Sequence, residues 1–311
     1  MASRLFPTNP RLPPELENII FEFVALSHPT NIPQIMLVAS RVKNWWWSLF
    51  LYRTVLLCTR RSRRILRSLQ IPSFPACPVD VLLRLIKTKP PAFLQQSVKH
   101  LFLDESVFAL EAETVQTVLS SCTQAVNVFA SCLTSTQALD PLARFQRLRR
   151  LTIDVHDFIS VCVIDGTALP DTLTHLHLLN TTSYFQYTGD PYVPALTAHI
   201  SSLKHLTHIA FDSAPPNALY AKLCSRWRTQ CVVCLNLEAC EIDAVAPLAE
   251  EDDRFVCIEQ NVPFREDWLR GTDGARDFWA LAEAFIAARR AGKVDSDEYS
   301  IVDDADDSWS I

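Results

Sequence analysis

Glycine is scarce in this sequence, with 5 residues among 311. A backbone turn that cradles phosphate groups depends on glycine, and the sequence contains no phosphate-binding loop. The G-x-S-x-G and H-E-x-x-H motifs of hydrolases and metalloproteases are also missing. No nucleophile–base pair can be recognised, so we expect no enzyme, no catalytic residues, no cofactor and no resident metal.

Long apolar runs are missing as well. None approaches the ~20 residues of a membrane span, and the opening residues MASRLFPTNP lack the apolar stretch of a secretory signal. The 10 cysteines are scattered through apolar segments, which is typical of free buried thiols in a reducing compartment. The sequence therefore predicts an intracellular protein, cytoplasmic or nuclear, that makes no contact with membranes.

Charge is unevenly distributed along the chain. The net charge is −6, yet residues 41–67 are basic without a single acid, and the stretch from Asp295 onward is acidic without a single base. Overall acidity argues against a nucleic-acid partner. The run CTRRSRRILRSL is read as a solvated helix face, with a phosphate-binding strip as the alternative.

A repeat emerges when the central segments are aligned. SVKHLFLDES, TQAVNVFAS, QRLRRLTIDVH and DTLTHLHLLNTT each carry an apolar–x–apolar pair, and the first members are equally spaced at Leu101, Val126, Leu151 and Leu176. Ile209, Leu235 and Val256 continue the series less regularly. Helical patterns fall between the pairs, beginning near Glu111, Thr136, Tyr192 and Asn217, whereas 155–170 has no clear pattern. Strands alternating with helices at such a period predict an α/β solenoid.

The central region resembles leucine-rich repeats, whose core is L-x-x-L-x-L-x-x-N. Leu148, Leu151 and Ile153 fit the first three positions, as do Leu173, Leu176 and Leu178, but the asparagine position holds other residues. The resemblance implies an irregular repeat with a curved parallel sheet. The alternative is a non-repetitive α/β domain with evenly spaced strands.

The N-terminal segment RLPPELENIIFEFV, followed by IPQIMLVASRVKNWWWSLFLYRTVLL, resembles an F-box over about residues 11–57. The chain as a whole is similar to a large set of fungal F-box-like proteins. The resemblance implies a non-catalytic adaptor whose N-terminal helices dock on the linker subunit of a cullin-type ubiquitin ligase, while the remainder captures a protein to be ubiquitylated. The implied linker-binding residues are Leu12, Pro13, Leu16, Ile20, Leu37, Val38 and Trp45.

Five regions are expected from these patterns: an F-box-like helical module at 1–57, a helical connector at 58–96, the leucine-rich-repeat-like region at 97–262, a capping helix at 263–293 and a disordered acidic tail at 294–311. The loop SHPTNIPQ departs from the charged connection common in F-boxes. A second hypothesis is therefore a repeat scaffold that binds a partner without any ligase contact. Trp45–Trp47 are consecutive, so in a helix they point in different directions and cannot all be buried on one face.

Polar residues alternate with the apolar pairs and are expected to share the outward face of the sheet. We interpret this face as the binding surface for the captured protein, with a metal-binding cluster around its histidines as the alternative. A zinc site at Cys231-x-x-Cys234 is disfavoured, because residues three apart on a strand point to opposite faces. The predicted partner-binding residues are His100, Asp104, Arg150, Asp154, His175, His177, His208, Asp212 and Glu238.

Overall fold

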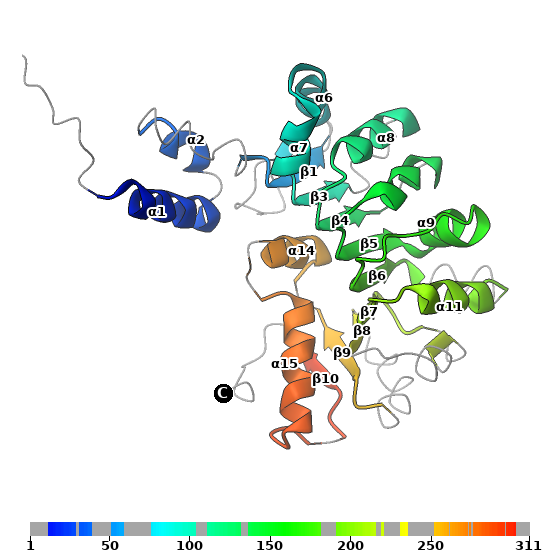
Figure 1. The fold of residues 1–311 in the computed structure, drawn as a ribbon. Coiled ribbons are helices and arrows are strands. Elements are labelled where there is room, and N and C mark those ends of the chain that lie inside the picture. Colours follow the sequence, from blue (N-terminus) through cyan, green and yellow to red (C-terminus); the bar gives the residue numbers. More distant parts are fainter. Residues whose placement is uncertain are drawn as a thin grey trace, which may run out of the picture.

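The computed structural model shows an α/β protein built on one ten-stranded sheet whose strands all run parallel (Figure 1). The structure describes residues 12–28, 31–38, 51–58, 76–103, 111–131, 136–181, 191–215, 219–220, 231–235, 252–260, 262–272, 274, 276–295 and 297–302. The strands are β1 (Thr54–Cys58), β2 (Ala76–Pro78), β3 (His100–Leu103), β4 (Asn127–Ala130), β5 (Arg150–Asp154), β6 (His175–Leu179), β7 (His208–Phe211), β8 (Cys231–Leu235), β9 (Phe255–Glu259) and β10 (Ser300–Val302).

The strand order is β10-β9-β8-β7-β6-β5-β4-β3-β1-β2. The predicted parallel, chain-ordered strands near Leu101, Leu151, Leu176, Ile209 and Leu235 are therefore confirmed. At one end the order departs from the chain, because β1 lies between β2 and β3. Strands β1, β4, β7 and β8 are buried along their whole length, as expected for a parallel sheet that is covered on both faces.

One face of the sheet is covered by the helices that connect the strands (Figure 1). Their apolar sides pack with Leu101, Leu151, Leu176 and Ile209 into the main core. These helices are α6 (Val79–Thr88), α7 (Pro91–Ser97), α8 (Ala112–Ser121), the 3₁₀ helix η3 (Thr136–Arg144), α9 (Val155–Phe158), the π-helix η4 (Ile159–Ile164) and α11 (Val193–Ser202).

The opposite face of the sheet is covered by two C-terminal helices, α14 (Phe264–Thr272) and α15 (Phe278–Arg290). Trp268 and Leu269 of α14 pack on Phe102 and Phe129. Phe285 and its neighbours on α15 pack on apolar residues of β8 and β9. Asp277 begins α15 as its N-cap, because its carboxylate accepts the Ala280 amide at 3.0 Å.

The N-terminal helices α1 (Pro14–Ser27) and α2 (Ile32–Ile35) stand beside the sheet (Figure 1). Pro14 occupies the first turn of α1, where its missing N–H costs nothing, and Glu15 and Glu17 lie at the positive end of the helix dipole. A helix is therefore present in the N-terminal segment for which the resemblance implied helices.

The predicted architecture, a short F-box-like helical module followed by an irregular leucine-rich-repeat-like solenoid, is wrong, although the α/β class is correct. Strand β1 lies inside the segment assigned to the helical module and pairs in the interior of the sheet. Strand β2 lies inside the segment predicted as a helical connector. The sheet is thus one continuous unit that begins before residue 57, because the apolar run at Thr54–Cys58 is fully buried as a strand.

The C-terminal predictions also need correction. A single helix was expected to cap the end of the repeat, but α14 and α15 instead lie across a face of the sheet. The acidic tail was expected to be disordered throughout, yet Ser300–Val302 form β10 and pair with β9. Ile301 is buried against the same cluster as α15; the acids flank this short apolar segment and do not prevent its pairing.

The predicted spacing of 25 residues between equivalent strand positions is not kept in the sheet. Laterally aligned inward positions are Leu101, Val128, Leu151, Leu176, Ile209, Val232 and Phe255. The step from Leu176 to Ile209 is clearly longer than the others. The predicted pairs at Val126 and Leu235 were out of register, because Val128 and Val232 take the aligned positions.

Smaller predictions can also be compared with the structure. The helix predicted near Glu111 is confirmed. The segment near Thr136 forms a 3₁₀ helix. Residues 155–164 are helical, although their sequence showed no clear helical pattern. Two predictions lie outside the described residues. These are the burial of Trp45–Trp47 and the role of the basic run that follows Cys58. Among the helices that the structure describes, none combines the length and apolar character that a membrane span requires.

Candidate functional site

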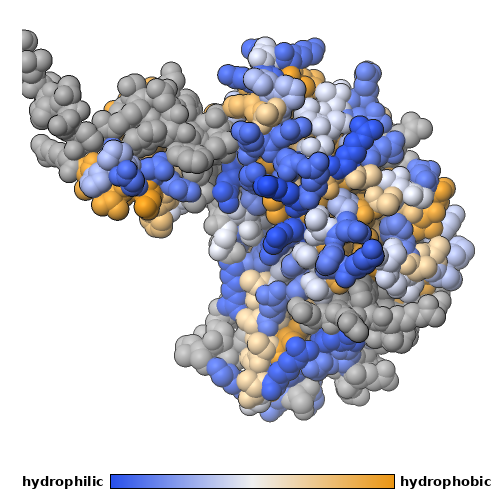
Figure 2. All heavy atoms as spheres, in the orientation of Figure 1, coloured by the Kyte–Doolittle hydropathy of each residue, from blue (hydrophilic) through white to orange (hydrophobic). Residues whose placement is uncertain are grey.

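Exposed apolar side chains gather on α1 and on the turn that follows α2. Leu16, Ile19, Ile20 and Phe23 are 50%, 59%, 48% and 71% exposed, and their spacing places them on one face of α1. We call the whole set, with the adjoining residues, the N-terminal apolar surface. Its members are Leu12, Leu16, Ile19, Ile20, Phe23, Leu37 and Val38. Figure 2 shows the part of it on α1 as an orange patch.

This surface contains most of the residues that the F-box resemblance implied. Leu12, Leu16, Ile20, Leu37 and Val38 are all exposed, and so is Pro13; Trp45 lies outside the described residues. Ile19 and Phe23 were not predicted, although their i+3 and i+7 spacing from Leu16 was a readable signal. Because exposed apolar groups are rarely gathered this way on a soluble protein, the surface is a candidate docking site.

The predicted partner-binding face is not open. His100 and His177 contact the rings of Trp268 and Phe278, and Arg150 donates to the N-cap Asp277 at 2.5 Å. The chain's own α14 and α15 thus cover the central part of this face. Asp104 and Glu238 lie outside the described residues.

The two acids on that face serve the turns at the ends of the strands. Asp154 caps α9 by accepting the His156 amide at 2.9 Å. Asp212 accepts the amides of Asn180 at 2.5 Å and Thr181 at 3.0 Å. Asn180 adopts a φ of 58°, a left-handed conformation that asparagine tolerates, and its side-chain amide donates to Asp154. These contacts hold the loop after β6.

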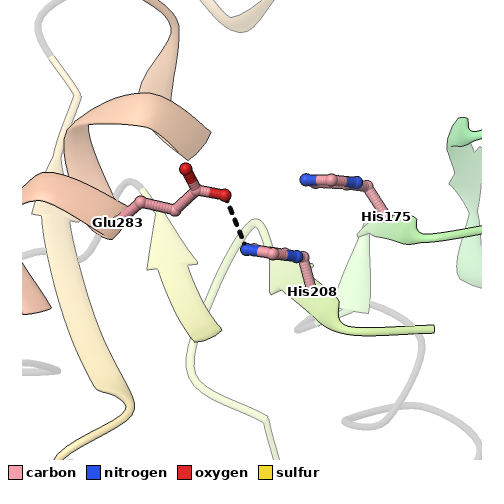
Figure 3. Close-up of side chains that lie close together, drawn as sticks. All are labelled: His175, His208 and Glu283. Carbon is pink, nitrogen blue, oxygen red and sulfur yellow. Dashed lines mark ion pairs between the residues drawn. The ribbon is translucent and has the colours of Figure 1, made fainter. Parts of the chain in front are cut away.

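A compact polar cluster lies where α15 crosses β6 and β7. The rings of His175 and His208 stack with centroids 4.1 Å apart and an interplanar angle of 7°. His208 Nε2 lies 2.8 Å from Glu283 Oε1, and one atom from each of the three side chains lies within 4.8 Å of the others. In Figure 3 the carboxylate of Glu283 faces the ring edges of both histidines. Trp279 closes the cluster by contacting both rings edge-on.

Burial sets the charge state of these histidines. It lowers the pKa of His175 to about 2, with further lowering by His208 and Arg150. It also lowers the pKa of His208, although Glu283 opposes this effect. His177 has its pKa lowered to about 4 by burial, with Asp212 acting in the opposite direction. Neutral imidazoles are the form that binds metal ions.

A small cavity of about 10 Å³ lies beside the cluster, lined by Asn127, Arg150, His175, Trp268 and Asp277 among others. This volume suits about one water molecule and no organic substrate. The cavity therefore favours an internal polar contact region over a pocket for a metabolite.

Several residues of this region were missed by sequence reasoning. Asn127 stands in the row of His100 and Arg150 and accepts the indole N–H of Trp268 at 3.0 Å; the register error at β4 hid it. Glu283 and Asp277 were missed because nothing in the linear sequence links a C-terminal helix to strands much earlier in the chain. Cys231 and Cys234 do point to opposite faces, one toward each core.

Comparisons with known proteins add little to this geometry. No family model matches the sequence, and no curated protein matches it. Among matching solved structures is a citrate lyase from Burkholderia xenovorans LB400, at 13% identity and a TM-score of 0.25, covering 78% of this chain and 83% of that one. A likeness this weak carries no conclusion about fold or activity.

Proposed function

We propose that the protein is a non-catalytic adaptor whose N-terminal segment docks on the linker subunit of a cullin-type ubiquitin ligase and whose remaining surface holds an unidentified protein for ubiquitylation. The observation that carries this proposal is the N-terminal apolar surface. Of the ten large apolar residues that are exposed among the described residues, seven lie between Leu12 and Val38. The resemblance of the same segment to an F-box supports the linker subunit as the occupant.

The physical argument rests on the cost of that exposure. Leaving several large apolar side chains in water forgoes roughly 1.5–3 kcal/mol each. On α1, only Ala25 is a fully buried apolar residue among those whose side chains are described, so the helix contributes little of its apolar surface to the fold. Burial against a partner recovers this free energy, and a helix laid with its i, i+3, i+4 and i+7 side chains in a groove is a recurring mode of recognition.

The test is binding of purified linker subunit to the full chain, measured by calorimetry. Leu16→Ala combined with Ile20→Ala should weaken binding about tenfold or more, because the pair forms one patch one helical turn apart. The matched control combines Ile164→Ala with Tyr192→Ala, two exposed apolar residues far from α1 in sequence, and should bind like the wild type. Circular dichroism should show unchanged secondary structure in both variants.

One result would reject the adaptor role, and a second would reject the assigned docking surface. One is a wild-type chain that does not bind the linker subunit at all, which favours a scaffold that works without a ligase. The other is equal weakening by the α1 pair and the control pair, which would place docking elsewhere than the N-terminal apolar surface.

A further inference from the structure

The side chains of His175, His208 and Glu283 meet at the crossing of α15 over β6 and β7, and the mechanism of an adaptor makes no use of them. We infer that these three side chains form a binding site for a divalent transition-metal ion of the zinc class, with the two histidine Nε2 atoms and the Glu283 carboxylate as ligands. The inference is independent of ligase docking.

The geometry is close to what such an ion requires. Around a tetrahedral zinc ion the ligand atoms lie about 3.3 Å apart, given bonds of about 2.0–2.1 Å. Here Glu283 Oε1 is 2.8 Å from His208 Nε2, and all three ligand atoms lie within 4.8 Å of one another. The side chain of Glu283 is 55% exposed and His208 is 6% exposed. The carboxylate is therefore free to adjust, while the histidine is held by the sheet.

The outer hydrogen bonds orient both rings. Each histidine follows a threonine, and the hydroxyl of each threonine lies 2.8 Å from Nδ1 of the next residue. The Thr174 hydroxyl also donates to the Arg149 carbonyl at 3.0 Å, and the Thr207 hydroxyl to the Thr174 carbonyl at 3.3 Å. A hydroxyl has one proton, so when the Thr174 hydroxyl donates to the carbonyl it accepts a hydrogen bond from Nδ1–H of His175.

That arrangement leaves His175 Nε2 with a lone pair on the side of Glu283, while His208 Nε2 pairs with the Glu283 carboxylate at 2.8 Å (Figure 3). Fixing one ring nitrogen by hydrogen bonding so that the other binds a metal is the usual arrangement around protein metal ions. Three potential ligand atoms therefore converge, and a bound cation would take the place of the proton between His208 Nε2 and the Glu283 carboxylate. Imidazole nitrogens favour zinc, copper or nickel over magnesium and calcium.

The surroundings also suit a cation. Arg150, whose charge acts on both histidines, is paired with Asp277. Cys231 occupies the next position in the same lateral row as His208, and Glu283 contributes to raising the pKa of its thiol, after burial. Because this thiol is not among the side chains whose ligand atoms lie within 4.8 Å of one another, the fourth coordination position is assigned to water.

The experiment uses the full chain, treated with chelator under reducing conditions and then titrated with Zn²⁺ in competition with a chromophoric chelator. The wild type should bind one Zn²⁺ more tightly than Glu283→Gln does, by more than tenfold, and should gain a higher melting temperature with Zn²⁺ but not with Mg²⁺. Co²⁺ should give the visible absorption bands of a tetrahedral site. Because Glu283 is exposed, its substitution should leave the fold intact.

Two further variants separate this site from metal binding by thiols elsewhere. Thr174→Val with Thr207→Val should weaken Zn²⁺ binding about 10–100-fold, as loss of outer hydrogen bonds to metal ligands does. The control His156→Gln, at a histidine whose side chain is 65% exposed and outside the cluster, should bind like the wild type. Equal Zn²⁺ affinity in the wild type and in Glu283→Gln would overturn the inference, and so would a wild type that binds no Zn²⁺.

Discussion

Replacing Asp277 tests whether the C-terminal helices belong to the fold of the sheet. Its two carboxylate oxygens have separate tasks: one accepts the Ala280 amide at 3.0 Å as the N-cap of α15, and the other accepts from Arg150 at 2.5 Å. Gly271 lies so close to this carboxylate that an added Cβ would collide with it. Asp277 therefore joins α14, α15 and β5 at a single point.

The magnitude follows from those two contacts. Loss of an N-cap costs about 0.5–2 kcal/mol. A hydrogen bond to a charged group contributes about 1.5–3 kcal/mol, and we take the lower end because the Arg150 side chain is 33% exposed while that of Asp277 is 6% exposed. Asp277→Ala should therefore lower the free energy of unfolding by about 2–4 kcal/mol. Asp277→Asn keeps the cap and should cost about half as much.

The assay is urea denaturation followed by circular dichroism and tryptophan fluorescence. Both signals should report one transition, because α15 packs on the same sheet as the rest of the core. Glu266→Ala serves as the control, since its ion pair with Arg270 is exposed on both sides and should contribute less than about 0.5 kcal/mol. If Asp277→Ala changes stability no more than the control, or if Asp277→Asn is equally damaging, the assigned roles of the two oxygens are refuted.

Two further predictions concern the same face of the sheet. Trp268→Phe removes the indole N–H that Asn127 accepts at 3.0 Å in a buried setting, so stability should fall by about 1–3 kcal/mol; denaturation measures it, and an unchanged midpoint would contradict the contact. His100 has its pKa lowered to about 3 by burial and by the nearby cations Arg53, Arg150 and Lys99. Since the unfolded histidine takes up its proton near pH 6.5 and the folded one only near pH 3, stability is lost as the pH falls between these values, by about 3 kcal/mol from pH 7 to pH 4. His100→Phe should flatten that part of the pH–stability curve relative to the wild type, and identical slopes would show that His100 does not cause the loss.

The sequence by itself determined the local elements whose pattern is short-range. Leu101, Leu151 and Leu176 identified strands correctly, and their parallel, ordered arrangement followed from the helical patterns between them. Pro14 with Glu15 and Glu17 fixed the start of α1. The exposed face of that helix was also partly readable, because Leu16 and Ile20 stand one turn apart.

Register and long-range coverage were decided only by the tertiary structure. At β4, Val126 and Val128 stand two residues apart and have the same parity, so period-two reasoning could not decide which of them lies beside Leu101 and Leu151; pairing with β3 and β5 selected Val128. Strand β1 reads equally well as the end of a helical module, and its full burial between β2 and β3 placed it in the sheet.

The role of the polar face was likewise decided by contacts across the chain. His175 and His208 could be assigned to one face of the sheet from alternation alone, but whether that face met solvent, a partner or the chain itself depended on where α15 packs. Nothing in the sequence around either histidine encodes Glu283, which lies far beyond both in the chain. The periodicity of side chains along a helix or strand depends only on local backbone geometry, so it can be read from a short segment of sequence. The covering of a sheet face by a distant helix depends on how much apolar area the two bury together, and a short segment does not contain that information.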